Sequence, residues 1–500
     1  MLDAAHILRQ AAARCGGAEA LVDGDRRWTY RALLDEAERL AGGIAGLGLA
    51  PGDRLASILR NRAEAALLHW ACQLAGVTIT PLNWRLTADE LDYCLENSEA
   101  KAVFFESASA EAVQGSPSAA TLPRIDVDAD FAGLAAAEPA SASGSMAETI
   151  SVMLYTSGTT GRPKGVPRRH RAERAAAIAH VAQNQYGRGE RTLGVMPLYH
   201  TMGVRSLLAS ALVDGCFICQ PRFDAGGALA LIEAERITNL YLVPTLYHDV
   251  LAHPDFARTD VSSVRKLGFA GASMTDGLLR RLQAAFRPDL FVNHYGSSEI
   301  YTFAIEPDAP AKPGSAGRAG LNQTIKVAKL GGGAGDPADV GEEGEIIADL
   351  AGDEAFEGYW RRPDADAKAL RDGWYHTGDT GFFDADGDLF VTGRVDDMII
   401  TGGENVSPVE IESALSLHPA VAEIAVAGMP DERWGQIVVA FVKRASPVDA
   451  KTLDAHCVAS GLARFKRPRR YEFVAEIPKS PVGKILRRLL QSGEYEKDPA

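Results

Sequence analysis

The stretch Tyr155-Thr-Ser-Gly-Thr-Thr-Gly-Arg-Pro-Lys-Gly165 decides how this sequence is interpreted. It follows residues 149–154, an apolar and β-branched segment that predicts a strand. Glycines let backbone N–H groups curl around an anion, the hydroxyls add donors, and the lysine adds positive charge. The loop therefore predicts a polyphosphate site, with a flexible glycine-rich turn as the plain alternative. It is not the common P-loop, because the Gly-x-x-x-x-Gly-Lys-Ser/Thr pattern is absent.

Further glycine-, charge- and hydroxyl-rich motifs follow in order, at residues 295–299, 373–379, 393–399, 402–408 and 478–484. This ordered set resembles the adenylate-forming superfamily of acyl-CoA synthetases, luciferases and peptide synthetase adenylation domains, over nearly the whole chain. Within it, the chain is most similar to the aryl-CoA ligases of the 4-chlorobenzoate–CoA ligase type, through residues 269–274, 393–404, 433–436 and 465–468.

Composition sets the broad class. A chain of 500 residues exceeds the usual single-core size, so we expect more than one domain. The net charge of -14 argues against nucleic-acid binding. No run of about 18 apolar residues indicates a membrane span, and no secretion signal is evident at the start, so we expect a cytoplasmic protein. Residues 461–488 are locally basic; most of these side chains predict a solvated face, and some could meet the phosphates of CoA.

The cysteines are scattered and do not predict a disulfide framework. Cys216 and Cys219 have the spacing of a redox or zinc pair, but they lie in a segment that predicts a strand. Residues three apart on a strand point to opposite faces, so we expect both to belong to the core.

The periodicity of the chain predicts its architecture. Early helix and strand patterns alternate at residues 30–44, 54–59, 63–75 and 77–81, which indicates parallel sheets covered by helices. A small-residue linker is expected at 135–147, an α/β region at 170–305, a small β subdomain at 313–392, and an α+β region beyond Arg394.

The resemblance implies the domain organisation. Residues 1–395 would form an N-terminal adenylation domain of two α/β subdomains plus a small β subdomain, which binds ATP and the acid. Residues 396–500 would form a mobile α+β C-terminal domain, with the hinge at Asp396, which as a residue type is also typical of a surface turn.

The resemblance also implies a reaction in two halves. A carboxylate is a poor electrophile, and its conversion to acyl-AMP with release of pyrophosphate supplies a good leaving group. CoA then displaces AMP to give the thioester. The expected cofactors and co-substrates are therefore ATP, Mg²⁺ and coenzyme A.

Residue roles follow from motif positions. Glu299 is the expected Mg²⁺ ligand, and Lys484, His200 and Glu299 are the expected catalytic residues. Lys484 would stabilise the charge between carboxylate and α-phosphate. The expected nucleotide-binding residues are Thr156, Ser157, Gly158, Thr159, Thr160, Lys164, Tyr295 against adenine, Ser298 at the α-phosphate, and Asp379 and Arg394 at the ribose.

For the second half, the resemblance implies rotation about Asp396. Gly402 and Gly403 would then line the pantetheine tunnel, where a side chain would block the passage, and Trp434 and Phe465 would contact CoA.

The acyl pocket is predicted from motif position and closed by aromatic rings. Its expected wall comprises His200, Thr201, Met202, Tyr241, Ala270, Gly271, His294, Tyr301 and Thr302. His294 and Tyr301 are polar where chlorobenzoate-type relatives carry apolar residues. We expect a hydroxyl, an amino group or a second polar group on the acid, unless protein or water satisfies both atoms.

The sequence thus predicts an AMP-forming carboxylate–CoA ligase for a benzoate-like or other small cyclic acid, with a role in aromatic acid metabolism. The alternatives are a medium-chain or branched aliphatic acyl-CoA synthetase, an enzyme that loads a carrier protein, a luciferase-type oxygenase, and a non-catalytic nucleotide-binding protein. Partners are a small carboxylic acid, with neither nucleic acid nor membrane; a homodimer is left open.

Overall fold

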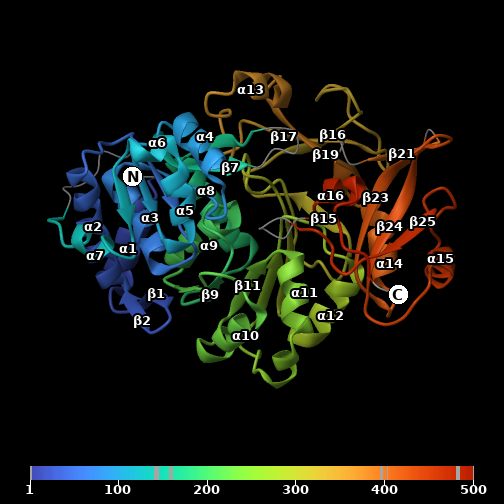
Figure 1. Cartoon of the computed structure of the whole chain (residues 1–500), viewed down its shortest axis with the longest axis horizontal. Coiled ribbons are helices and arrows are strands. Elements are labelled where there is room, and N and C mark those ends of the chain that lie inside the picture. The colour runs from blue at the N-terminus through green and yellow to red at the C-terminus, as the bar shows by residue number, and fades with distance from the viewer. Residues whose placement is uncertain are drawn as a thin grey trace.

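The computed structural model describes residues 3–139, 146–156, 162–394, 398–402, 404–479 and 485–498. The N-terminal α/β layers lie at one end of the molecule and the C-terminal sheet at the other, with the β-rich segment between them (Figure 1). This is the mixed α/β architecture, with a large N-terminal region and a smaller C-terminal one, that the sequence predicts.

The first sheet has the strand order β6-β5-β3-β4-β7-β8. Its neighbours run parallel except β7 and β8, which are antiparallel and flank the glycine-rich loop. The strands are β3 (Arg54–Ile58), β4 (Thr78–Pro81), β5 (Ala102–Phe105), β6 (Arg124–Asp126), β7 (Ile150–Thr156) and β8 (Lys164–Arg169). The helices in this part of the chain are α1 (Ala5–Cys15), α2 (Tyr30–Gly46), α3 (Ala63–Ala75), α4 (Ala88–Ser98), α5 (Ala110–Gly115), α6 (Pro117–Ala120) and α7 (Phe131–Leu134).

Local sequence explains these helices. Thr29 caps α2 by accepting a hydrogen bond from the Ala32 N–H, and the apolar positions of α2 recur at helical spacing, so one face is buried. By contrast, α3 is buried on nearly every side, which fits its almost continuous apolar sequence.

The second sheet begins with the order β13-β12-β11-β9-β10-β1-β2 and is parallel from β13 to β1. Its strands are β1 (Glu19–Asp23), β2 (Arg26–Thr29), β9 (Arg191–Gly194), β10 (Cys216–Cys219), β11 (Asn239–Leu242), β12 (Lys266–Phe269) and β13 (Leu290–Tyr295). The accompanying helices are α8 (His170–Gln183), α9 (Thr201–Leu212), α10 (Ala225–Ala234), α11 (Pro244–Ala252) and α12 (Asp276–Phe286).

This sheet continues into antiparallel strands, which form the expected small β region. The order β16-β17-β19-β20-β15-β14 joins β13 through β14, and β18 pairs with β19. The elements are β14 (Ala304–Glu306), β15 (Ser315–Ala319), β16 (Ile325–Ala328), β17 (Gly344–Asp349), α13 (Pro363–Ala369), β18 (Leu370–Arg371), β19 (Trp374–Phe383) and β20 (Leu389–Arg394).

The C-terminal part forms a separate sheet with the order β22-β21-β24-β23, and β25 pairs with β24. It meets the N-terminal region where the Gly277 N–H donates to Ser416 Oγ over 3.3 Å. Its elements are β21 (Ile399–Thr401), β22 (Glu404–Val406), α14 (Pro408–Ser416), β23 (Val421–Asp431), β24 (Gly435–Arg444), α15 (Ala450–Ala459), β25 (Arg470–Phe473) and α16 (Arg487–Ser492).

The six cysteines are all free thiols, and only Cys15 is not fully buried. Cys216 and Cys219 lie in β10, as expected, and both are packed in the core. Burial raises the pKa of Cys216 to about 12, which fits an inert core thiol. Within the part of the chain that the structure describes, no helix has the length and apolar character needed to cross a membrane.

Helix α9 depends on a glycine. A Cβ on Gly203 would lie 2.2 Å from the Pro197 carbonyl oxygen and 2.5 Å from that of Met196. This close approach holds the start of α9 against the preceding segment, and therefore fixes where residues 200–205 point.

We expect Gly203→Ala to lower the free energy of unfolding by about 1–3 kcal/mol, because backbone oxygens cannot move aside cheaply. The control is Gly46→Ala at the end of α2, where an added Cβ meets no heavy atom within 4 Å; this change should be neutral or stabilising by about 0.4–1 kcal/mol. Urea denaturation of the two variants checks both values, and equal effects would contradict the packing argument.

Candidate active site

Lys164 stands at the base of the glycine-rich loop. Strands β7 and β8 pair so that Thr156 lies opposite Lys164, and Thr156 Oγ1 donates to the Lys164 carbonyl over 3.5 Å. The Lys164 ammonium lies 4.0 Å from the centre of the Tyr359 ring, a cation–π contact. Burial lowers the pKa of Lys164, although the Glu299 carboxylate opposes this shift. The expected loop residues Ser157, Gly158, Thr159 and Thr160 lie outside the described residues.

Glu299 is only 5% exposed and is held by its neighbours. The Tyr359 hydroxyl donates to Glu299 Oε1 over 2.7 Å, so one tyrosine touches both Glu299 and Lys164. The turn around Glu299 needs a glycine, since a Cβ on Gly296 would lie 2.1 Å from the Tyr301 carbonyl oxygen. Ser298 lies half-buried in this turn. Tyr359 was missed at the sequence level, although its place beside a tryptophan in a glycine-flanked segment offered a signal.

Three of the predicted nucleotide residues meet at the end of β13. Asp379 and Arg394 are register partners on β19 and β20, and Arg394 Nη1 lies 3.1 Å from Asp379 Oδ1. The Tyr295 hydroxyl donates to Asp379 Oδ2 over 2.7 Å. Burial is the main cause that raises the pKa of Tyr295 well above its usual value, and the nearby Asp379 charge adds to it. This cluster presents a fixed carboxylate beside an aromatic ring.

His200 caps the start of α9. Its Nδ1 accepts from the Met202 N–H over 3.3 Å, so in the neutral imidazole Nε2 carries the proton. Thr201 and Met202 follow in the first turn and are buried. The helix cap thus fixes both the tautomer and the direction of the ring.

The predicted acyl wall collects at the carboxyl ends of three neighbouring parallel strands. Tyr241 is on β11, Ala270 and Gly271 follow β12, and His294 is on β13. The Tyr241 and His294 rings are 5.2 Å apart in an edge-on arrangement. In open α/β sheets this edge is where ligands bind.

The polar wall residues have protein partners. Tyr301 donates its hydroxyl to Glu173 Oε2 over 3.1 Å, so the protein alone satisfies it. His294 Nε2 lies 3.0 Å from Asn184 Nδ2 and 3.2 Å from Asn184 Oδ1, whereas its Nδ1 is buried without a hydrogen bond in the part of the chain that the structure describes. Burial holds the pKa of His294 well below its usual value, and the Arg205 charge adds to this, so the ring is neutral.

Sequence reasoning also missed Arg205, which connects this wall. Its guanidinium donates to Thr302 Oγ1 over 2.7 Å, to the Tyr301 carbonyl over 3.2 Å and to the Tyr241 hydroxyl. The available signal was a single charge in the otherwise uncharged helix α9.

The predicted CoA residues lie in the C-terminal sheet. Gly402 has φ +62°, and a Cβ there would lie 2.8 Å from the Trp434 ring, so glycine suits this position on both counts. The Arg469 guanidinium lies 4.0 Å from the centre of the Trp434 ring. Phe465 is exposed. Gly403, Asp396 and Lys484 lie outside the described residues.

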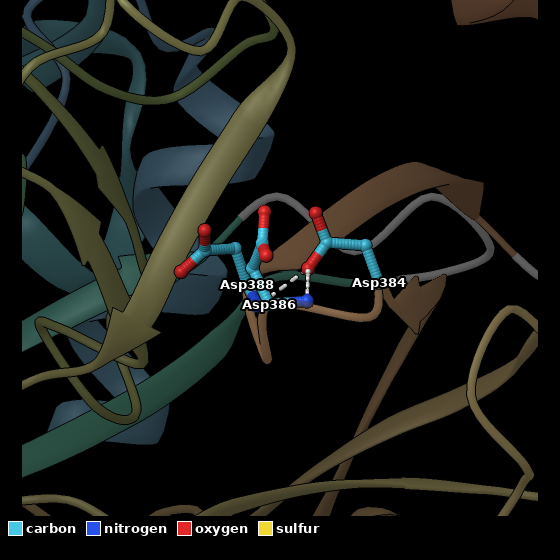
Figure 2. A group of neighbouring side chains, drawn as sticks. All are labelled: Asp384, Asp386 and Asp388. Atoms are coloured by element: carbon cyan, nitrogen blue, oxygen red, sulfur yellow. Dashed lines mark hydrogen bonds between the residues drawn. The ribbon is translucent and has the colours of Figure 1, made fainter.

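The acidic turn between β19 and β20 is not a convincing metal centre. Asp384, Asp386 and Asp388 bring their carboxylates together (Figure 2). However, the Lys312 ammonium lies 2.6, 2.9 and 2.5 Å from their oxygens and neutralises part of the charge. The ion pairs with Lys312 therefore account for the grouping of the three carboxylates.

Comparison with known proteins identifies the class. The model of the AMP-binding enzyme family matches residues 8–360, and that of the AMP-binding enzyme C-terminal domain matches residues 410–484. The chain is 35% identical to a 4-chlorobenzoate–CoA ligase of Arthrobacter sp, covering 98% of this chain and 95% of that protein. It is 34% identical to the long-chain-fatty-acid–CoA ligase FadD13 of Mycobacterium tuberculosis, covering 97% of each.

A solved structure agrees over the same length. The crystal structure of the anthranilate CoA ligase AuaEII in complex with anthranoyl-AMP matches with a TM-score of 0.92 and 28% identity, covering 98% of this chain and 97% of that one. The chain belongs to the AMP-binding enzyme family. It is an ATP-dependent, AMP-forming acid–thiol ligase that uses Mg²⁺ and CoA. The substrates named for its relatives differ, so they do not fix the acid that this chain uses.

We expect Tyr359→Phe to lower kcat/KM for ATP by about 10-fold, because a hydrogen bond to a charged group contributes roughly 1.5–3 kcal/mol, and to raise the Mg²⁺ concentration needed for half-maximal rate. Pyrophosphate release at varied Mg²⁺ checks this. The matched control is Tyr375→Phe, whose hydroxyl lies 3.5 Å from that of Tyr359. An unchanged Mg²⁺ requirement in Tyr359→Phe would refute its role.

Proposed function

We propose that this enzyme activates a benzoate-like or other small cyclic carboxylic acid as its acyl-AMP and transfers the acyl group to CoA. The observation that carries this proposal is the ring cluster at the ends of β11 and β13. His180, Tyr241 and His294 have ring centres 4.7 to 5.3 Å apart. Such a cluster supports a short pocket closed by aromatic rings rather than a long open channel.

In the first half-reaction, two clusters of residues in the N-terminal region would bind and orient ATP. Lys164 and the glycine-rich loop would hold the β- and γ-phosphates, and Asp379, Tyr295 and Arg394 would hold the adenosine. The ammonium group of Lys164 would neutralise part of the polyphosphate charge.

The residues present fit a magnesium ion. Glu299 offers a buried carboxylate beside Lys164, and hard oxygen ligands are those that Mg²⁺ prefers. Bound there, the ion would supply further neutralisation of phosphate charge. Tyr359 fixes the carboxylate by its hydrogen bond and so would orient it toward the phosphates.

Lys484 would act where negative charge builds between the acid and the α-phosphate. The division at 395 and 396, with a hinge at Asp396, would then let the C-terminal domain present Gly402, Gly403 and Trp434 for the second half. The separate C-terminal sheet supports this division. His200, with its proton on Nε2, would lie between acyl group and incoming thiol.

A basic cavity beside the His200 segment supports a phosphate-bearing thiol substrate. It is lined by Arg85, Arg222 and Tyr199, which precedes His200, and by Arg60, whose guanidinium is paired with Glu106 at 2.6 Å. Burial raises the pKa of Tyr199 to about 12, although the Arg85 guanidinium opposes this shift. Arginines are well suited to phosphate groups.

Two other functions remain in view. A medium-chain or branched aliphatic acid differs only in the depth of pocket that it needs. A carrier protein could replace free CoA as the acceptor. The ring cluster favours a small cyclic acid over an aliphatic one. The basic cavity favours a phosphate-bearing acceptor, but it does not distinguish CoA from the pantetheine arm of a carrier protein.

A screen of pyrophosphate release tests the proposal. We expect a small aromatic or alicyclic acid to exceed hexanoate and octanoate by about 10-fold or more in kcat/KM, since a hydrophobic pocket distinguishes about 10- to 200-fold per methylene of misfit. Thioester should form only when CoA is added. If no acid splits ATP between its first and second phosphates, the activity itself is refuted; if octanoate is best, the acid class is wrong.

We expect Lys484→Ala to abolish formation of acyl-AMP but to spare thioester formation from supplied acyl-AMP, because the lysine charge serves only the first half. Single-turnover measurements of each half-reaction check this. Lys479→Ala is the neighbouring lysine control and should retain both halves. Equal loss of both half-reactions in Lys484→Ala would contradict the division of roles.

A further inference from the structure

Arg205 is a buried charge without an ion-pair partner. It is 2% exposed, and within the described part of the chain no carboxylate lies within ion-pair distance of it. The other fully buried arginine of this region, Arg168, is paired with Glu173 at 2.9 Å. Since a buried charge is normally paired or coordinates a ligand, Arg205 needs an explanation that Arg168 does not.

The hydrogen bonds of Arg205 leave part of it available. Tyr301, Thr302 and Tyr241 use three of its five N–H groups, which leaves two, and one of these is on Nε. Among the described residues, Nε is buried without a hydrogen-bond partner. All three partners belong to the predicted acyl wall, so their hydrogen bonds hold the guanidinium against that wall.

The ionisable side chains around Arg205 do not form an ion pair with it in the described part of the chain. His180 and His294 are both buried, and burial keeps the pKa of each well below its usual value, with the Arg205 charge adding to the shift. His180 Nε2 and His294 Nδ1 are buried, and no residue that the structure describes forms a hydrogen bond with either atom. Burial raises the pKa of Glu354, although Arg205 and Arg168 oppose the shift. Glu173 is paired with Arg168, and within the described part of the chain neither Glu173 nor Glu354 forms an ion pair with Arg205.

We propose that Arg205 recognises a second carboxylate on the acid, at the end remote from the carboxylate that becomes the acyl group. This inference rests on the proposed function, and it narrows the substrate class to a small cyclic dicarboxylic acid. A carboxylate accepts two parallel hydrogen bonds from a guanidinium edge and supplies the missing charge. The Tyr241 hydroxyl accepts from Arg205 and braces it in place.

The experiment compares acids that have the same shape but a different charge. Phthalate, isophthalate and terephthalate are each matched with the corresponding carbamoylbenzoate, and benzoate serves as the unsubstituted reference. We expect one dicarboxylate to exceed its carbamoyl partner by about 10-fold or more in kcat/KM, because a hydrogen bond to a charged group is stronger than one to a neutral group. The same dicarboxylate should raise the melting temperature more than its amide does.

Variants assign the preference to Arg205. Arg205→Met should lower kcat/KM for the dicarboxylate by about 10- to 100-fold more than it lowers kcat/KM for benzoate, because only the dicarboxylate loses a charged partner. Arg205→Lys should keep part of the preference, since it retains charge but not the planar edge. Ser206→Ala is the matched control on the same helix, because Ser206 Oγ donates to the Met202 carbonyl over 2.7 Å, a bond within α9 itself.

The outcomes separate this inference from the proposed function. Activity on benzoate with equal rates and equal melting shifts for each acid and amide pair would overturn the role of Arg205 and leave the ligase activity standing. The role of Arg205 is also overturned if Arg205→Met lowers the melting temperature but leaves the selectivity ratio unchanged, because Arg205 would then only balance Glu354. Absence of pyrophosphate release with every acid would refute the proposed function, while the melting shifts would still decide the dicarboxylate preference.

Discussion

The arrangement of the site depends on one buried arginine. Arg168 is 0% exposed and lies on β8, directly after the glycine-rich loop. Its guanidinium donates to Glu173 on α8 and to the carbonyl oxygens of Glu299 and Glu354, and it covers the Tyr301 ring at 4.0 Å. One side chain therefore joins the strand behind the phosphate loop, the turn that carries the proposed metal-binding carboxylate, and the wall of the predicted acyl pocket. Loss of Arg168 would leave the buried Glu173 carboxylate with the hydrogen bond from Tyr301 but without the positive charge of Arg168.

This link explains why distant motifs act together. The glycine-rich loop belongs to the first sheet, whereas Glu299 follows β13 of the second. Tyr359 adds a contact from the segment before α13, since it touches Lys164 and Glu299 at once. The nucleotide half of the site is thus built from three regions of the chain. Backbone hydrogen bonds also join them, because the Trp360 N–H donates to the Gly165 carbonyl over 2.8 Å and the Phe356 N–H donates to the Glu299 carbonyl over 3.0 Å.

The fold could be predicted from the sequence, and the structure brings together some of the residues predicted for the site. The spacing of apolar residues and the positions of glycines predicted the helix at 63–75, the strand before the glycine-rich loop and the β-rich segment, because these patterns are local in the sequence. The resemblance implied that Tyr295, Asp379 and Arg394 all bind the nucleotide, and the structure brings their side chains together through a hydrogen bond and an ion pair. Tyr359 and Arg205 were missed because their importance lies in partners far away in the chain, and no local pattern encodes such contacts. For Tyr301, the hydrogen bond to Glu173 replaces the expected need for a polar substrate group.

The state of the cysteines has a practical consequence. In all six, burial raises or helps to raise the thiol pKa, so none carries much thiolate at neutral pH. Five are fully buried, and Cys15 is only partly accessible. In an activity assay, a thiol-reactive dye therefore reacts mainly with the thiol of free CoA. A fall in the dye signal therefore measures the consumption of CoA directly, with little background from the cysteines of the enzyme.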